Sequence, residues 1–486
     1  MRVEYALAWL LPLLAGSALC ALAAAPGAWR GRSAAIIGSG WLAGVYLVAC
    51  AACLVGRDDT LHALAAVAPW LAAMTMAGWV VVLIRRFVRK RRGGGDVMHE
   101  VAAIPWQRAA WWLLLALVLL RLLLLGAEAA WRPVFPWDAW SAWALKPKSW
   151  ILLGHVEPYV PMLDWLADPY AATRTAATWN YPELLAWIEV WFASGAGGWN
   201  EPLVNLAWSG ALSAFLLSAY GYWRGFGIGA LPTLGLVFAL ASLPLLDAHV
   251  ALAGYADLWI AVTLGLSLLA WSRWLLLRER GQWLLAIAFA ACLPAIKLEG
   301  AIWLALFGVV AAYELVPARW RRLAVAGGLA MLVLGLVLIC IASHLSVRGS
   351  GWLRFDWRSV QLAAAPPLEL GWHPVGGAML ASLFTLPNWH LFWYALPLLV
   401  VLRRRFLALD RPARLLGLIV LLQCLALFVL FFFTNAGAWA ADFTSAIRLI
   451  LQLVPGVFVF IAMLLRDLPG VAARAAPARF QATQSR

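Results

Sequence analysis

Apolar residues fill this chain in long, unbroken stretches that are separated by short polar connections. Most stretches approach the ~17–25 residues that an α-helix needs to cross a bilayer, and none shows the alternation of a membrane β-barrel strand. The pattern predicts an all-α polytopic membrane protein with about thirteen transmembrane helices. They are placed at 5–25, 35–56, 61–84, 109–127, 201–223, 229–247, 256–277, 282–296, 300–317, 323–343, 389–402, 412–433 and 446–466.

Composition agrees with a membrane protein. Of the 486 residues 64% are hydrophobic and 12% are charged, whereas a soluble domain carries about 25% charged residues. The net charge of +14 does not indicate nucleic-acid binding, because the basic residues gather in short loops between apolar runs, where topology and anionic lipid account for them. The six cysteines lie in or beside apolar runs, and we expect them to pack there rather than to bind metal.

The basic run from Arg85 to Arg92 sets the expected orientation. Short cytoplasmic loops are rich in Lys and Arg, and placing this run in the cytoplasm makes every second connection cytoplasmic. Those connections also hold most of the remaining arginines. The opposite set comprises 128–200, 248–255, 297–299, 344–388 and 434–445, which are rich in Trp, Asp, Glu and His. The sequence thus predicts an inner-membrane protein whose polar groups face the extracytoplasmic side.

Four regions follow from this topology. They are an N-terminal trio of membrane helices (1–84), a cytoplasmic basic linker (85–107), a membrane region that carries the polar outer loops (108–466) and a cytoplasmic tail (467–486). The first 25 residues also resemble a signal peptide, although we expect them to be retained as a helix. Within 128–200, residues 183–195 predict an amphipathic helix at the membrane surface.

The first candidate group stands in the Trp-rich segment 131–148. Asp138 is flanked by tryptophans, and Lys146 and Lys148 follow it. A carboxylate near cations can abstract a proton beside a bound phosphate. The tryptophans themselves are expected at headgroup depth, so they do not indicate sugar stacking.

Further candidates open or connect the outer ends of the spans. Tyr181 precedes Pro182 and could line a cavity or simply mark a helix start. Asp257 begins a span, where it either serves function or stabilises the helix N-terminus. Lys297 and Glu299 form a Lys-x-Glu-Gly turn that could present the lysine to an anion, the alternative being a lysine whose ammonium reaches the surface.

Arg448 lies at the outer start of the last apolar run. Its guanidinium could bind a phosphate bidentately, or it could pair with Asp442 or another outer carboxylate. The outer histidines have no metal-ligand spacing, so no cofactor is expected, although outer carboxylates could hold a divalent cation.

The order of these elements resembles the GT-C superfamily of polyprenyl-phosphate-sugar-dependent glycosyltransferases, of the protein O-mannosyltransferase and lipid A aminoarabinose transferase type. The resemblance covers roughly 105–466. It implies a helical bundle with juxtamembrane helices in the first outer loop and sugar transfer on the extracytoplasmic side. It implies Asp138 as the base that activates the acceptor and Asp257 as a second acid. Many relatives carry an acidic pair where Asp138 is followed by Ala139.

The function expected from this resemblance is transfer of a sugar from a polyprenyl-phosphate donor to a lipid, glycan or protein acceptor. Residues 146, 148, 297 and 448 would supply the cations for the lipid phosphate, with Tyr181 and Glu299 beside them. Membrane lipids are the other expected partners. The alternatives are a transporter or flippase, whose ionisable groups would lie near the bilayer midplane, and a surface-polysaccharide ligase or polymerase.

Overall fold

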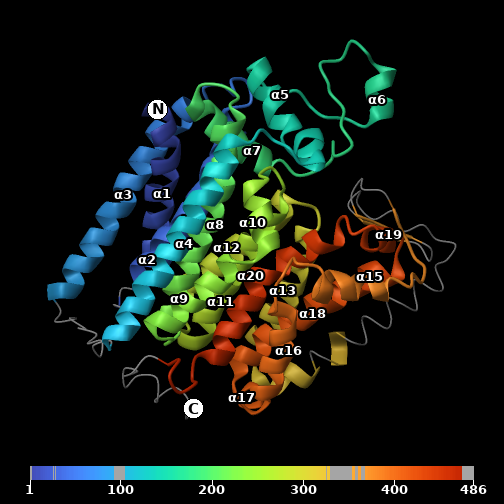
Figure 1. Ribbon diagram of the computed structural model, residues 1–486. Coiled ribbons are helices and arrows are strands. Elements are labelled where there is room, and N and C mark those ends of the chain that lie inside the picture. The colour runs from blue at the N-terminus through green and yellow to red at the C-terminus, as the bar shows by residue number, and fades with distance from the viewer. Residues whose placement is uncertain are drawn as a thin grey trace.

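The protein is a bundle of helices in the computed structural model (Figure 1). The structure describes residues 3–25, 27, 29–91, 104–323, 326–328, 353–355, 359–362 and 367–472. The longer helices are α1 (Val3–Ala23), α2 (Arg32–Val55), α3 (Ala63–Arg91), α4 (Pro105–Trp131), α7 (Leu184–Ala196), α8 (Glu201–Gly225), α9 (Ala230–Ala241), α11 (Asp257–Leu277), α12 (Arg280–Ile296), α13 (Gly300–Leu315), α16 (Phe392–Leu402), α18 (Arg411–Phe433) and α20 (Ala446–Leu465).

Short elements connect them. They are the π-helices η1 (Ala139–Trp143) and η3 (Ala381–Thr385), the 3₁₀-helix η2 (Ala318–Trp320), and the helices α5 (Leu145–Leu153), α6 (Met162–Ala167), α10 (Pro244–Ala251), α15 (Gly376–Leu380), α17 (Arg404–Leu409) and α19 (Gly437–Ala441). Strands β1 (Leu353–Phe355), β2 (Ser359–Leu362) and β3 (Leu368–Glu369) form a small antiparallel sheet in that order, with Leu353 opposite Leu362 and Val360 opposite Leu368.

The polytopic membrane architecture predicted from the apolar runs is confirmed. Among the described residues, eight helices are long and apolar enough to cross a membrane, namely α1, α2, α3, α4, α8, α11, α18 and α20. The number rises to ten if two bent pairs each make one span. The stretches predicted at 282–296 and 389–402 form helices of 17 and 11 residues, and most of the one predicted at 323–343 lies outside the described residues. Thirteen spans therefore remains a prediction.

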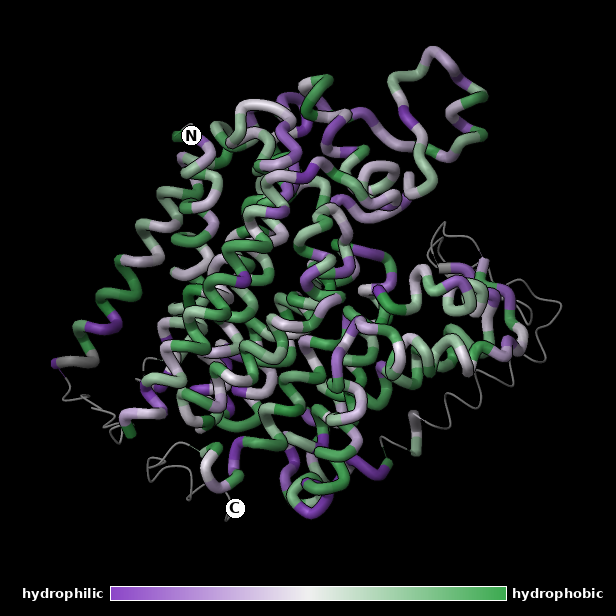
Figure 2. The backbone as a smooth tube through the Cα atoms, in the orientation of Figure 1, coloured by the Kyte–Doolittle hydropathy of each residue, from purple (hydrophilic) through white to green (hydrophobic). Residues whose placement is uncertain are grey.

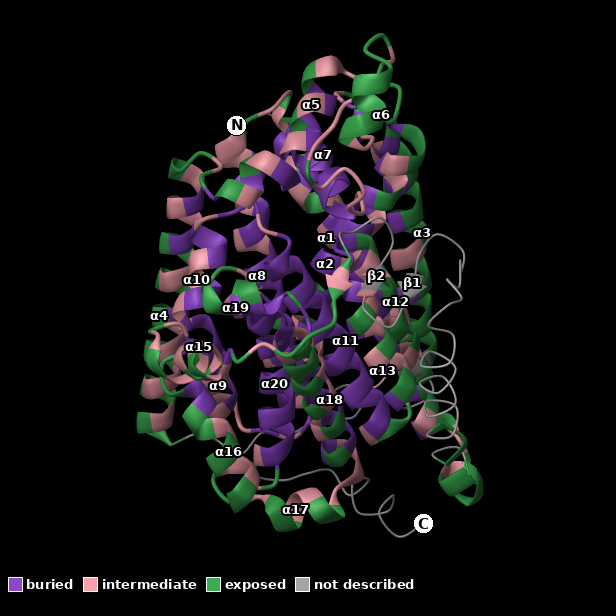
Figure 3. Ribbon diagram, turned by 90° about the vertical axis from the view of Figure 1, so that its right-hand side faces the viewer, coloured by how far each residue is buried: buried purple, intermediate pink, exposed green. Residues whose placement is uncertain are grey.

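Helices α11 and α20 form the centre of the bundle, and α3 and α4 lie at its edge (Figure 3). The most apolar window is 89% buried in each central helix and 17% buried in each peripheral one. One hydrophobic core extends from Tyr5 in α1 to Leu464 in α20. Helices α1 and α2 pack on α7, and α2 also packs on α8, so the N-terminal trio shares its core with the rest of the chain.

Small residues let α1 and α2 approach closely. A β-carbon at Gly44 would lie 1.8 Å from the Pro12 carbonyl oxygen, and one at Gly40 would lie 2.5 Å from Ser17 Oγ. Gly40 and Gly44 form the small-x-x-x-small spacing by which membrane helices bring their backbones together. This contact joins the first helix to the bundle.

Helix α7 corrects the prediction of an amphipathic surface helix at 183–195. The helix is buried on all sides, and Trp187 and Trp191 are 1% and 0% exposed. The Trp191 indole donates to the Ala8 carbonyl oxygen at 2.8 Å. Apart from Glu189 its residues are apolar or small all round, and a helix of that kind packs inside a protein rather than at an interface.

A break divides the span that was predicted at 229–247. Helices α9 and α10 meet there at a bend of 63°, and the break frees backbone carbonyl groups. Arg121, within α4, donates from Nε to the Ala241 carbonyl oxygen at 2.6 Å and pairs with Asp247. His390 Nε2 lies 2.9 Å from the Ser242 carbonyl oxygen. Because unsatisfied carbonyl groups are costly in lipid, Arg121 supports the break.

The polar segments lie mainly at the ends of the bundle. The segment with α5 and α6 stands at one end, and α17 stands at the other (Figure 1). Hydrophobic positions fill the space between them, and hydrophilic ones are frequent in both end regions (Figure 2). The segment with α5 and α6 and the Arg-rich helix α17 thus lie at opposite ends of the bundle.

Candidate functional site

Four segments that are remote in sequence bring charged side chains together at one end of the bundle. They are the residue before η1, the first residue of α11, the turn between α12 and α13, and the first turn of α20. Their charged side chains are Asp138, Asp257, Lys297 and Arg448, joined by Glu299 from the same turn as Lys297. We call these five residues the mixed-charge cluster.

Lys297 forms ion pairs with Asp257 and Glu299. Its Nζ lies 3.0 Å from Asp257 Oδ1 and 3.3 Å from Glu299 Oε1, and 6.0 Å from the centre of the Trp143 ring. Burial by itself would lower the pKa of the Lys297 ammonium, but Asp257 and Glu299 outweigh it and hold that pKa above its usual value. The predicted Lys-x-Glu-Gly turn is therefore present, and its lysine points into the protein.

A chain of hydrogen bonds fixes Asp257. Gln452 Nε2 donates to Asp257 Oδ1 at 2.6 Å, and the Trp303 indole donates to Gln452 Oε1 at 2.6 Å. All three side chains are buried. The other carboxylate oxygen, Asp257 Oδ2, is buried without a hydrogen-bond partner. Asp257 is thus anchored through one oxygen.

Arg448 connects the last helix to the first outer loop. Its Nη1 donates to Asp138 Oδ2 at 2.5 Å across 310 positions of the sequence, and its Nη2 donates to Ser445 Oγ at 2.9 Å. The guanidinium carbon lies 4.8 Å from the centre of the Tyr255 ring. The Asp138 side chain is 40% exposed and that of Arg448 is 17% exposed. The Asp138–Arg448 pair is thus more exposed than the Asp257–Lys297 pair.

Gly254 allows the loop before α11 to reach η1. Its φ is +114°, a conformation that L side chains rarely adopt, and a β-carbon there would lie 2.5 Å from Ala139 Cβ. Ala139 directly follows Asp138 in the chain. A glycine at this position therefore brings the Asp138 segment next to the segment that carries Tyr255 and Asp257.

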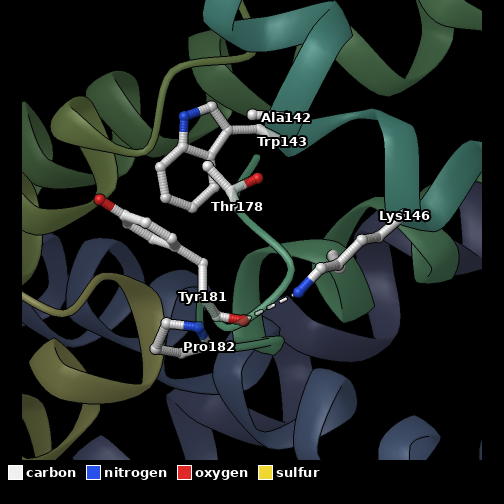
Figure 4. Close-up of a pocket in the computed structure, with 7 residues that line it drawn as sticks. Ala142, Trp143, Lys146, Thr178, Tyr181 and Pro182 are labelled. Carbon is white, nitrogen blue, oxygen red and sulfur yellow. Dashed lines mark hydrogen bonds between the residues drawn. The ribbon is translucent and has the colours of Figure 1, made fainter. Parts of the chain in front are cut away.

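A small hollow lies beside the mixed-charge cluster. Its volume is about 230 Å³, including space open to solvent, and its lining includes Trp143, Lys146, Thr178 and Tyr181 (Figure 4). The rings of Trp143 and Tyr181 meet edge to face at 5.0 Å. Burial raises the pKa of the Tyr181 phenol, as does the negative charge of Glu299. Tyr181 thus lines this hollow.

The two lysines of the first outer loop have other partners. Lys146 is buried and donates to the carbonyl oxygens of Trp179 and Tyr181, at 2.9 and 3.0 Å. Burial lowers its pKa to about 8. Lys148 pairs with Glu201 Oε1 at 2.8 Å. Of the four cations that were predicted to bind a phosphate, Lys297 and Arg448 belong to the mixed-charge cluster, and Lys146 and Lys148 have other partners.

The Asp257–Lys297 and Asp138–Arg448 pairs differ in how readily a ligand could separate them. Asp257 and Lys297 have side chains that are 1% and 10% exposed, and Gln452 also donates to Asp257. Asp138 accepts from Arg448 near the surface. An incoming phosphate would compete with Asp138 for the same guanidinium, because arginine binds both kinds of oxyanion in a similar geometry. Asp138 would then be free to accept a proton.

Sequence reasoning missed Gln452 and Trp303. Gln452 follows Arg448 by four positions, so both lie on one face of α20. A glutamine inside a strongly apolar span is itself a signal, because an amide in lipid needs a partner. Trp303 carried no such signal, since tryptophans occur throughout the chain. Within the described part of the chain, no group of three His, Cys, Asp or Glu residues could hold a metal ion.

Comparison with protein families, with curated proteins and with solved structures finds no match to this chain.

Proposed function

We propose that this protein is a membrane glycosyltransferase of the GT-C type, which moves a sugar from a polyprenyl phosphate to an extracytoplasmic acceptor. The observation that supports the proposal is the Asp138–Arg448 pair beside the anchored Asp257–Lys297 pair. It joins a base that can accept a proton to a cation that can bind a phosphate. A lipid-linked donor suits a site at the end of a transmembrane bundle, because its tail stays in the bilayer.

In the proposed reaction the donor phosphate takes the Arg448 guanidinium from Asp138. The released carboxylate accepts the proton of the acceptor hydroxyl as its oxygen attacks the anomeric carbon. The bond between that carbon and the phosphate oxygen breaks, and polyprenyl phosphate leaves with the electron pair. Lys297 and Arg448 stabilise the negative charge on the leaving phosphate. Attack opposite the leaving group inverts the anomeric centre.

The orientation belongs to the same proposal. The positive-inside rule puts the Arg-rich end in the cytoplasm, so the mixed-charge cluster would face the extracytoplasmic space. A cluster on the cytoplasmic face would exclude an extracytoplasmic acceptor. Labelling of single cysteines introduced in 159–175 and in α17 with an impermeant reagent, on intact cells, tests this side assignment.

The catalytic test uses purified protein and a polyprenyl-monophosphate sugar. We expect release of polyprenyl phosphate, and we expect Asp138→Asn to reduce it by about 10²- to 10⁴-fold, the range of general-base catalysis. Asp164→Asn is the matched control, since Asp164 is an exposed aspartate of the same loop. The proposal fails if the Asp138→Asn variant folds normally and keeps wild-type turnover.

A transporter is the second candidate, and the α9–α10 break favours it. Discontinuous helices with ionisable groups are typical of transporter sites, and the Arg121–Asp247 pair lies at this break. Movement of the lipid-linked sugar across vesicles without release of polyprenyl phosphate would support this class. In that case Arg121→Gln should abolish movement, and Asp138→Asn should leave it intact.

A further inference from the structure

A second charged cluster lies on α11, α13 and α18, away from the mixed-charge cluster. Glu314, near the end of α13, is 1% exposed, and three arginines surround its carboxylate. Arg278 Nη2 lies 2.5 Å from Oε1, Arg321 Nη2 lies 3.8 Å from Oε2, and Arg411 pairs with Oε2. We call Glu314 and these three residues the arginine cluster.

Each arginine is positioned by the end of a helix. Arg278 follows α11 in the left-handed conformation, with φ of 55°, and its N–H donates to the Trp274 carbonyl oxygen. Arg321 follows η2 and donates from Nε to the Val316 carbonyl oxygen at 2.9 Å. Arg411 is the first residue of α18. The cluster thus belongs to the frame of the bundle.

Positive charge is in excess at this cluster. One carboxylate faces three guanidinium groups, and two other carboxylates in the described neighbouring segments have their own partners. Glu279 pairs with Arg273 at 2.6 Å, and Asp410 pairs with Arg466. Like charges held together repel one another unless an anion lies between them. The arrangement therefore favours an additional anion.

The guanidinium groups can be reached from outside. The Arg278 and Arg411 side chains are 51% and 38% exposed, although both contact the buried Glu314. The Arg278 guanidinium carbon lies 4.4 Å from the centre of the Trp274 ring. Trp320, which directly precedes Arg321 in the chain, is 50% exposed. Arginine beside exposed tryptophan at the end of a membrane helix is typical of the headgroup region.

We propose that the arginine cluster binds the phosphate of an anionic phospholipid headgroup. The phosphate oxygens would accept hydrogen bonds from the exposed N–H groups of Arg278 and Arg411, while the buried Glu314 carboxylate keeps both side chains in place. Basic pockets between membrane helices bind such headgroups. Free phosphate has the same chemistry but lacks the acyl chains that would lie along the apolar surfaces of the helices. This proposal is independent of the proposed glycosyl transfer.

The test measures lipid binding to the purified full chain in detergent. Phosphatidylglycerol and phosphatidylcholine are compared by native mass spectrometry and by the shift in unfolding temperature. We expect retention of phosphatidylglycerol only, and affinity about fivefold weaker for each arginine removed in Arg278→Gln and Arg411→Gln. Arg405→Gln is the matched control, because it removes the same charge from an exposed position of α17.

Each outcome decides the proposal. Equal binding of the two lipids, or equal losses in the cluster variants and in Arg405→Gln, would overturn it. A third arm adds inorganic phosphate, and if phosphate alone gives the full shift and displaces the lipid, the ligand is a free phosphate instead. Circular dichroism checks that the variants fold. If one variant does not fold, the other decides, because each removes one guanidinium of the cluster.

Discussion

Helix α11 carries a charged cluster at each end, and the two clusters differ in balance and in exposure. Asp257, its first residue, belongs to a cluster of three carboxylates and two cations in which the central pair is buried. Arg278, which follows its last residue, belongs to a cluster of three cations and one carboxylate.

The difference between the two clusters indicates a different function for each. In the mixed-charge cluster, Gln452 and Lys297 both donate to one oxygen of the buried Asp257, and the Asp138–Arg448 pair is the more exposed one. In the arginine cluster, the carboxylate is buried but two of its partners face outward. The first arrangement is suited to chemistry on a bound substrate, and the second to holding an anion.

Removing the central cation should have the largest effect. Lys297→Met leaves Asp257 buried without its cation, and we expect a loss of about 3–5 kcal/mol in the free energy of unfolding. Lys148→Met is the control, since the Lys148 side chain is 45% exposed and an exposed pair contributes about 0–1 kcal/mol. Denaturant unfolding followed by tryptophan fluorescence measures both. Equal losses would show that the buried pair is no more important than the exposed one.

Removing the carboxylate of the arginine cluster should lower the free energy of unfolding by a smaller amount, on the order of 1–3 kcal/mol. In Glu314→Gln the guanidinium groups lose their buried partner, but the exposed ones regain water. The variant also leaves a larger positive excess, so we expect tighter binding of phosphatidylglycerol than in the wild type. Unfolding with and without that lipid measures both effects. A cluster that serves only to join helices would lose stability without gaining affinity.

Gln452→Leu tests whether neutral donors fix the mixed-charge cluster. The change removes the hydrogen bond to Asp257 and leaves the Trp303 indole without its acceptor. We expect a loss of about 1–2 kcal/mol in the free energy of unfolding. Gln423→Leu is the matched control, because Gln423 is buried in α18 and both of its side-chain amide atoms have no partner. If the two variants lose stability equally, the hydrogen-bond chain has no special role.

The smallest expected effect is the pH dependence of stability that Lys146 causes. Burial lowers its pKa to about 8 in the folded protein, whereas the unfolded chain keeps the usual value of about 10.4. Above pH 8 the unfolded chain therefore binds more protons, and stability rises with pH. Relative to Lys146→Met, the wild type should gain about 1 kcal/mol between pH 7 and pH 9. A flat difference across that range would contradict the lowered pKa.

All five residues of the mixed-charge cluster could be named from the sequence, and their placement on the outer side stays a prediction. Asp138, Asp257, Lys297, Glu299 and Arg448 were named from their places at span ends, and the structure brings them together. Residues 146 and 148 were named on the same grounds but have other partners. The alternative in which Arg448 pairs with an outer carboxylate is also present, with Asp138 in the place of Asp442.

The apolar runs by themselves determined the helical membrane fold. Run length and loop charge are local properties, since each helical residue adds about 1.5 Å of span whatever its neighbours are. Only the tertiary structure decided which helices lie at the centre, that α7 is buried, and that Arg448 reaches Asp138 across 310 positions. Those outcomes depend on packing between helices, which the hydropathy of a single helix does not specify.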